Sequence, residues 1–222
     1  MKQPQLFGIP RSGGTVIYNI CRVIWGDEHI KPQSHEYFEG DRPVIATYRD
    51  FRDTLVSQWR SYNLGLEGRG FDDEANMEKM SLQEALFHAN DFKRAINRLD
   101  HFKADEQDDG RKVLFLCYEN FFDNEKGDLN FEYIFETIET FFDMEIGHAT
   151  KRYIKQEFNF NAVKEYSKQF SDFNEYDKKT HVHGHHLFKG AFGTWKNLIP
   201  SEHHEAVTAS LRDELTRWNY EL

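Results

Sequence analysis

The sequence is poor in cysteine and has no long apolar run. Only Cys21 and Cys117 are present among the 222 residues, far apart and in apolar surroundings, which favours two buried, reduced thiols over a disulfide. No stretch approaches the roughly 18 to 20 apolar residues of a spanning helix. The first apolar run, at residues 7–9, is too short for a signal peptide. We therefore expect no membrane partner and a reducing, cytoplasmic location.

Positive charge is also scarce, since 28 Lys and Arg residues face 38 Asp and Glu residues, a formal net charge of −10. This balance argues against a nucleic-acid partner, which would need a cationic surface to displace counterions from phosphates. The chain is nevertheless 39% hydrophobic with 20 Phe, too rich for a disordered protein. Its length suits one domain with elaborations, and no repeat or linker interrupts it, so we expect residues 1–222 to form a single domain.

Strand-like and helix-like segments alternate along the chain. Short apolar strands are predicted at residues 5–9, 43–48 and 112–118, and apolar stripes at helical spacing follow the first two. A capping-box pattern at residues 81–84 precedes a long amphipathic helix, with a solvated loop expected over 103–111. Further helices are expected around 131–142 and from Ser201, with a polar loop over 167–193. This alternation predicts an α/β fold with a mostly parallel central sheet flanked by helices.

A glycine-rich turn at residues 8–15 nearly matches the phosphate-binding pattern G-x-x-x-x-G-K-[ST], after a strand and at the start of a helix. Backbone N–H groups in such a turn form a concave seat for anionic oxygens, although an ordinary tight turn would give the same pattern. Gly14 stands where the lysine would be, and the positive charge of the turn comes from Arg11. The missing lysine argues against an enzyme that hydrolyses ATP or GTP.

Residues 10–15 resemble the 5′-phosphosulfate loop of sulfotransferases that use 3′-phosphoadenosine 5′-phosphosulfate (PAPS), some of which have Arg at the position of Arg11. Residues 48–57 resemble the 3′-phosphate element of that family, R-[DN]-P-[RK]-D-x-x-x-S, with Phe51 in place of the proline. Residues 189–197 are similar to its K-G-x-x-G-[DE]-W-K-N block, with Thr194 at the acidic position. Residues 117–120 resemble its R-Y-E-D strand end.

The resemblance implies a P-loop NTPase-like sulfotransferase fold and a role for each matching residue. The phosphosulfate would be held by the turn, and the 3′-phosphate by residues of the second and third elements. Tyr118 would contact adenine, while Phe188 and Val16 replace an arginine and a tryptophan common in the family. The implied cofactor-binding residues are Arg11, Ser12, Gly13, Gly14, Thr15, Arg49, Ser57, Tyr118, Lys189 and Gly190.

A base must accept the proton of the acceptor, and three residues are candidates. His35 comes first, in a Ser-His segment where the family carries its catalytic histidine, and its ordinary pKa of about 6.5 suits the task. Glu36 is the reserve and His29 the third option, while a solvated loop histidine is the structural alternative for His35. A histidine-rich run at 181–186 could chelate zinc or form a mobile loop or lid, and we favour the loop.

Together these features predict an enzyme that transfers a sulfuryl group from PAPS to a hydroxyl or amine of a small or carbohydrate-like acceptor. Arg11 would stabilise the leaving group, adenosine 3′,5′-bisphosphate (PAP), and no metal is required because that leaving group has a low pKa. An ATP-dependent kinase-like enzyme and a non-catalytic nucleotide-binding module are the alternatives. The sequence predicts neither the acceptor nor the oligomeric state.

Overall fold

Three parallel strands form the centre of the fold. The computed structural model describes residues 2–26, 30, 34–67, 79–171, 174–184 and 190–222. Strands β1 (Gln5–Gly8), β2 (Val44–Tyr48) and β3 (Val113–Cys117) pair in the order β1-β2-β3, with Leu6 opposite Ile45 and Ile45 opposite Leu114. An isolated parallel bridge between Phe7 and Ser34 extends the sheet beyond β1. All three strands therefore end at the same edge of the sheet.

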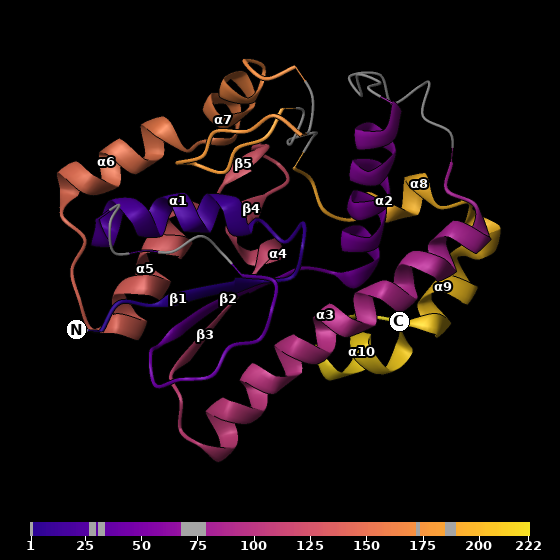
Figure 1. Cartoon of the computed structure of the whole chain (residues 1–222), viewed down its shortest axis with the longest axis horizontal. Helices are drawn as coiled ribbons and strands as arrows, with labels where there is room; N and C mark the ends of the chain where they lie inside the picture. The colour runs from indigo at the N-terminus through magenta and orange to yellow at the C-terminus, as the bar shows by residue number, and fades with distance from the viewer. Residues whose placement is uncertain (1, 27–29, 31–33, 68–78, 172–173, 185–189) are drawn as a thin grey trace.

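Helices cover both faces of this sheet, because alternate side chains of each strand point to opposite sides. On one face Leu6, Ile45 and Leu116 join the apolar side chains of α1 (Gly14–Trp25), α5 (Phe131–Phe142) and α6 (His148–Glu157). On the other face Phe7 and Ala46 pack with α2 (Phe51–Glu67), α3 (Leu82–Asp108) and α9 (His204–Ser210). Figure 1 shows these two groups of helices on either side of the strands. The predicted α/β fold with a parallel sheet is confirmed.

Shorter elements connect these layers. They are α4 (Tyr118–Phe121), the antiparallel pair β4 (Phe122–Asp123) and β5 (Asp128–Leu129), α7 (Phe160–Ser167), α8 (Trp195–Leu198), a 3₁₀ turn (Ser201–His203) and α10 (Arg212–Arg217). No helix in the described ranges is both long and apolar enough to cross a membrane. The two cysteines are free, Cys21 buried and Cys117 half-buried.

The capping box is confirmed at the start of α3, where the Ser81 hydroxyl accepts from the Glu84 N–H at 3.3 Å and the Glu84 carboxylate accepts from the Ser81 N–H at 2.9 Å. The solvated loop expected over 103–111 is wrong, because α3 continues to Asp108. Asp105 in its last turns accepts from Tyr37 and, at 3.0 Å, from Arg111. These contacts hold a charged helix end against the body of the protein.

The C-terminal region also differs from the expectation of one helix from Ser201. A 3₁₀ turn begins there, and a break at Leu211, which is fully buried, divides the following chain into α9 and α10. The helices α6 and α7 were not predicted from the sequence pattern. The expectation of a single domain stays a prediction.

Candidate active site

The glycine-rich turn joins β1 to α1 at the carboxyl edge of the sheet. Gly13, the residue before α1, has φ +81°, and a Cβ there would lie 2.8 Å from Phe121 and 2.9 Å from Tyr118. Only glycine combines that backbone conformation with so close an approach. No side chain caps the helix, and the N–H groups of Gly14 and Thr15 in its first turn have no partner within the helix. This helix end is a seat for an anion.

Ser12 shapes this turn through its side chain. Its buried hydroxyl lies 2.6 Å from the carbonyl oxygen of Ile9, to which it donates, and 2.7 Å from the hydroxyl of Thr47 on β2. The Ser12 N–H donates to the same Ile9 carbonyl at 3.2 Å. Ser12 therefore fastens the turn to the middle strand, while the backbone that follows it faces the anion seat.

Arg11 brings positive charge to the turn from a left-handed backbone position, with φ 68°. Its Nε donates to the hydroxyl of Ser57 on α2 at 3.1 Å. Burial, and next the nearby positive charge of Arg49, lower the pKa of Arg11 to about 10. The two positive charges repel one another, and an anion close to both would remove that cost.

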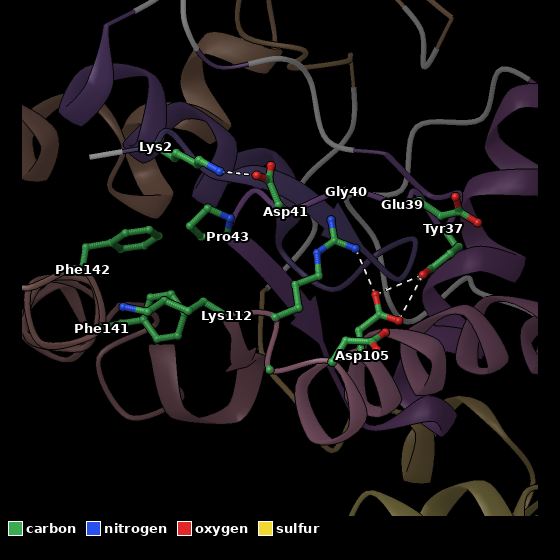
Figure 2. Close-up of a pocket in the computed structure, with 13 residues that line it drawn as sticks. Lys2, Tyr37, Glu39, Gly40, Asp41, Pro43, Asp105, Lys112, Phe141 and Phe142 are labelled. Atoms are coloured by element: carbon green, nitrogen blue, oxygen red, sulfur yellow. Dashed lines mark hydrogen bonds and ion pairs between the residues drawn. The ribbon is translucent and has the colours of Figure 1, made fainter.

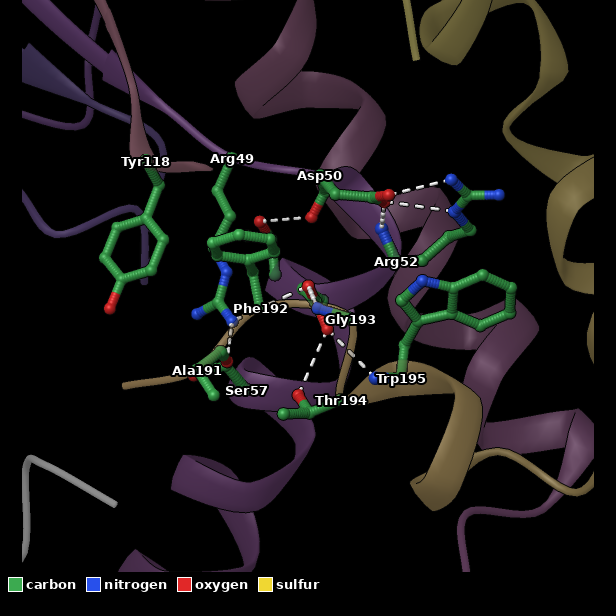
Figure 3. Close-up of polar contacts among 12 residues, drawn as sticks. Arg49, Asp50, Arg52, Ser57, Tyr118, Ala191, Phe192, Gly193, Thr194 and Trp195 are labelled. Atoms are coloured by element: carbon green, nitrogen blue, oxygen red, sulfur yellow. Dashed lines mark hydrogen bonds and ion pairs between the residues drawn. The ribbon is translucent and has the colours of Figure 1, made fainter. Parts of the chain in front are cut away.

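Arg49 follows the end of β2 and is only 7% exposed. Its Nη2 donates to the carbonyl oxygen of Ala191 at 2.7 Å, and its guanidinium lies 4.5 Å from the centroid of the Tyr118 ring (Figure 3). Its Nε is buried and has no hydrogen-bond partner among the described residues. A buried donor without an acceptor is costly, and a phosphate oxygen would satisfy it.

Tyr118 closes the site from the end of β3. Its hydroxyl donates to the carbonyl oxygen of Gly190 at 2.6 Å, and its ring stacks on Phe122 with centroids 5.4 Å apart. Burial raises the pKa of Tyr118 to about 12, so this hydroxyl stays protonated. Gly190 has φ +70°, and a Cβ there would lie 2.5 Å from Phe122. The backbone at Gly190 thus fits against Tyr118 and Phe122 only because residue 190 has no side chain.

His35 and Glu36 are the two candidates for the base that the structure describes, and their side chains have different partners. Backbone bonds between Ser34 and β1 bring His35 next to the start of the turn, where its Nδ1 lies 2.7 Å from the carbonyl oxygen of Gly8. Because a carbonyl accepts, Nδ1 carries the proton and Nε2 keeps its lone pair. The Glu36 carboxylate is instead paired with Arg98 at 2.6 Å. This favours His35, and both assignments stay predictions.

Other predicted residues lie elsewhere. Lys189, His29 and residues 185–186 of the histidine-rich run fall outside the described residues. His181 contacts the edge of the Tyr18 ring on α1, at 5.4 Å between centroids, and His183 stacks on Tyr176 at 4.9 Å. Within the described ranges no group of three His, Cys, Asp or Glu residues is arranged to hold a metal ion. In the described part of the run, His181 and His183 pack against tyrosine rings.

A pocket of about 750 Å³ lies at the opposite, amino-terminal edge of the sheet (Figure 2). It is lined by Lys2, Tyr37, Glu39, Gly40, Asp41, Pro43, Asp105, Asp109, Gly110, Arg111, Lys112, Phe141 and Phe142. Lys2 pairs with Asp41, and Arg111 pairs with Asp105 at 3.0 Å. The pocket lies at the strand ends opposite to those that lead into the glycine-rich turn, so it is separate from the candidate site. Because both positive and negative side chains line it, it favours neither an anion nor a cation.

Comparison with known proteins shows the class of fold. No protein-family model matches the chain, and no curated protein matches it in sequence. Solved structures do match over nearly the whole chain, and they show that the protein has the fold of PAPS-dependent sulfotransferases.

Two of these structures define the likeness. Mouse sulfotransferase SULT7A1, complexed with PAP, superposes with a TM-score of 0.63 at 14% identity, over 98% of this chain and 85% of that chain. Retinol dehydratase, in complex with androsterone and the inactive cofactor PAP, superposes with a TM-score of 0.59 at 12% identity, over 100% and 83% of the two chains. The predicted fold is thereby confirmed, while the site residues stay predictions.

Proposed function

We propose that the protein is a sulfotransferase that moves a sulfuryl group from PAPS to a hydroxyl or amine of a small or carbohydrate-like acceptor. The observation that carries the proposal is the pair of positive charges on Arg11, which is half-buried, and Arg49, which is buried, beside the start of α1, which no side chain caps. Such a concentration of positive charge in a protein of net charge −10 suits a small polyanion. Both matched structures contain PAP, which supports the same ligand class here.

The described residues fit this nucleotide in two groups. The N–H groups of Gly13, Gly14 and Thr15 would hold the 5′ end together with Arg11, while Ser12 keeps the turn in shape. The buried Nε of Arg49 and the hydroxyl of Ser57 would bind the 3′-phosphate, with Lys189 and Gly190 completing that side as the resemblance implies. Tyr118 would lie beside adenine.

Transfer then depends on positioning and charge. PAPS supplies the sulfuryl group and a leaving group that departs without protonation, so the proposal needs no metal. The acceptor oxygen or nitrogen forms its bond to sulfur as the bond from sulfur to the 5′-phosphate oxygen breaks. His35 Nε2 takes the acceptor's proton, and its Nδ1–H stays on the Gly8 carbonyl. Arg11 and the N–H groups of the turn stabilise the charge that develops on the departing oxygen.

The decisive test compares thermal unfolding with PAP, with ATP and with ATP plus magnesium. Stabilisation by PAP supports the proposal, whereas stabilisation by ATP plus magnesium alone would assign the site to a kinase-like enzyme. Transfer of labelled sulfate from PAPS to a panel of sugars, phenols and peptides then tests catalysis. An Arg11→Ala variant should show no transfer. Tight PAP binding without transfer to any acceptor would favour a non-catalytic nucleotide-binding module.

A further inference from the structure

Asp53 is a fully buried carboxylate in the first turn of α2 that joins this helix to a distant part of the chain. Its Oδ2 accepts from the Gly193 N–H at 2.5 Å, and its Oδ1 accepts from the Trp195 N–H at 2.9 Å and from the Thr194 hydroxyl at 3.1 Å. Three consecutive residues thus donate to one side chain. The contacts bring the 190–195 segment onto the start of α2 (Figure 3).

The same carboxylate lies beside Arg49. Asp53 Oδ2 is 3.6 Å from Arg49 Nη2, and that nitrogen donates to the carbonyl oxygen of Ala191 in the segment that Asp53 holds. A second contact fixes the segment from the side of Arg52, whose guanidinium lies 4.5 Å from the centroid of the Trp195 ring. Arg49 therefore sits between a helix and a segment that are fastened to each other through Asp53.

We infer that Asp53 is a positioning residue for the nucleotide site, which fixes the Arg49 guanidinium and the 190–195 backbone in one arrangement before the 3′-phosphate binds. The inference rests on the proposed function, in which Arg49 holds that phosphate. Preorganised donors bind an anion more tightly because less side-chain entropy is lost on binding when the donors are already held in place. Asp53 touches neither nucleotide nor acceptor and acts through Arg49 and the segment.

The geometry requires a carboxylate at this position. Both oxygens of Asp53 accept from backbone N–H groups, so an Asn amide in either orientation would point a donor at a donor. Thr194 belongs to the same arrangement, since its hydroxyl supplies a hydrogen to Asp53. Thr194 is thus matched to Asp53 in this chain.

The test measures affinity by calorimetry for two probes, PAP and AMP, which differ in the 3′-phosphate. Asp53→Asn is expected to weaken PAP binding about tenfold or more while AMP binding changes less than about threefold. Glu139→Gln is the matched control, because this carboxylate on α5 also accepts from a backbone N–H, that of Ile146 at 2.6 Å, and pairs with Lys151 instead of holding the 190–195 segment. It should leave the ratio of the two affinities unchanged.

Threonine variants extend the test should Asp53→Asn not fold. Thr194→Val removes one donor to Asp53 and should lower the ratio of PAP affinity to AMP affinity by about threefold, whereas Thr194→Ser should leave that ratio unchanged. Equal weakening of both probes, or no change in the ratio, overturns the inference. If the unaltered protein binds neither probe, the proposed function fails instead, so the two failures are distinguishable.

Discussion

Arg11 donates through Nε to the hydroxyl of Ser57 at 3.1 Å, across 46 residues of sequence. The bond joins the glycine-rich turn to α2, so the two elements expected to bind opposite ends of one nucleotide meet directly. Burial, and next the positive charge of Arg49, lower the pKa of Arg11, so the two arginines also interact electrostatically. The two elements proposed to bind phosphate are therefore coupled to each other.

Arg11→Met should make the protein without ligand more stable and nearly inactive. Methionine keeps the aliphatic length and the left-handed backbone but removes a half-buried charge that Arg49 repels. We expect the Tm to rise by about 2–4 °C per kcal/mol gained and kcat to fall by about 10²–10³-fold. Calorimetric melting and sulfate-transfer assays measure the two effects. Arg11→Lys, which keeps the charge, should retain much of the activity, and a lower Tm for Arg11→Met would contradict this account.

Gly13→Ala should destabilise the protein and abolish nucleotide binding. Its Cβ would meet Phe121 at 2.8 Å, in a turn whose φ of +81° already disfavours alanine. Gly127→Ala is the matched control, because Gly127 has φ +65° and a Cβ there meets nothing within 4 Å. Urea unfolding should show an additional loss of about 1–3 kcal/mol for Gly13→Ala. Equal losses in the two variants would mean that close packing at Gly13 contributes nothing.

His35→Ala should reduce kcat about 10²–10⁴-fold with little effect on PAP affinity, because the side chain is proposed to remove a proton from the acceptor. Glu36→Gln breaks only the ion pair with Arg98 and should change kcat less than about threefold. Steady-state kinetics of both variants measure this difference. The reverse pattern, with Glu36→Gln inactive and His35→Ala active, would transfer the role of base to the glutamate.

Acid should destabilise the protein partly through His181. Burial, then the positive charges of His183 and Arg22, lower the pKa of His181 below its usual value, while Asp177 opposes the shift. The unfolded chain thus binds this proton more readily, and stability is lost as the pH falls from about 6.5 through the folded-state pKa. His181→Asn, which tolerates the φ of 54°, should reduce the fall in urea midpoint between pH 7.5 and 5.5.

An exposed histidine provides the control for that measurement. His148→Asn at the start of α6 should leave the difference between the two pH values as it is in the unaltered protein. A fall in midpoint for His181→Asn as large as that of the unaltered protein would show that His181 does not cause the acid sensitivity.

Sequence patterns predicted those parts of the fold whose structure depends on a few neighbouring residues. The strands and the Ser81 capping box were found because alternation, apolar runs and caps act over a few residues. The end of α3 was missed because its last turns are held by contacts of Asp105 with Tyr37 and Arg111, which sequence spacing does not reveal. The break at Leu211 was missed for a similar reason, since its full burial depends on the rest of the core.

The candidate site divides in the same way. The residues of the turn, Arg49 and Ser57 could be chosen from the sequence, since they stand at strand and helix ends in a recognisable order. Their contacts could not be read from it. The resemblance implied that Ser57 binds the 3′-phosphate, and the structure adds its bond to Arg11. The contacts of Asp53 with residues 193–195 were not predicted, because they join segments about 140 residues apart in the sequence.

The contacts of Asp53 also set the order in which the protein can become functional during its synthesis. Its partners Gly193 and Trp195 lie 140 and 142 residues further along the chain. At a translation rate of about 5–20 residues per second, Asp53 exists for about 7–28 s before those partners are made. During this interval the nascent chain carries Arg49 and Asp53 without the 190–195 segment that they contact. The proposed nucleotide site is therefore complete only after residues 193–195 have been made.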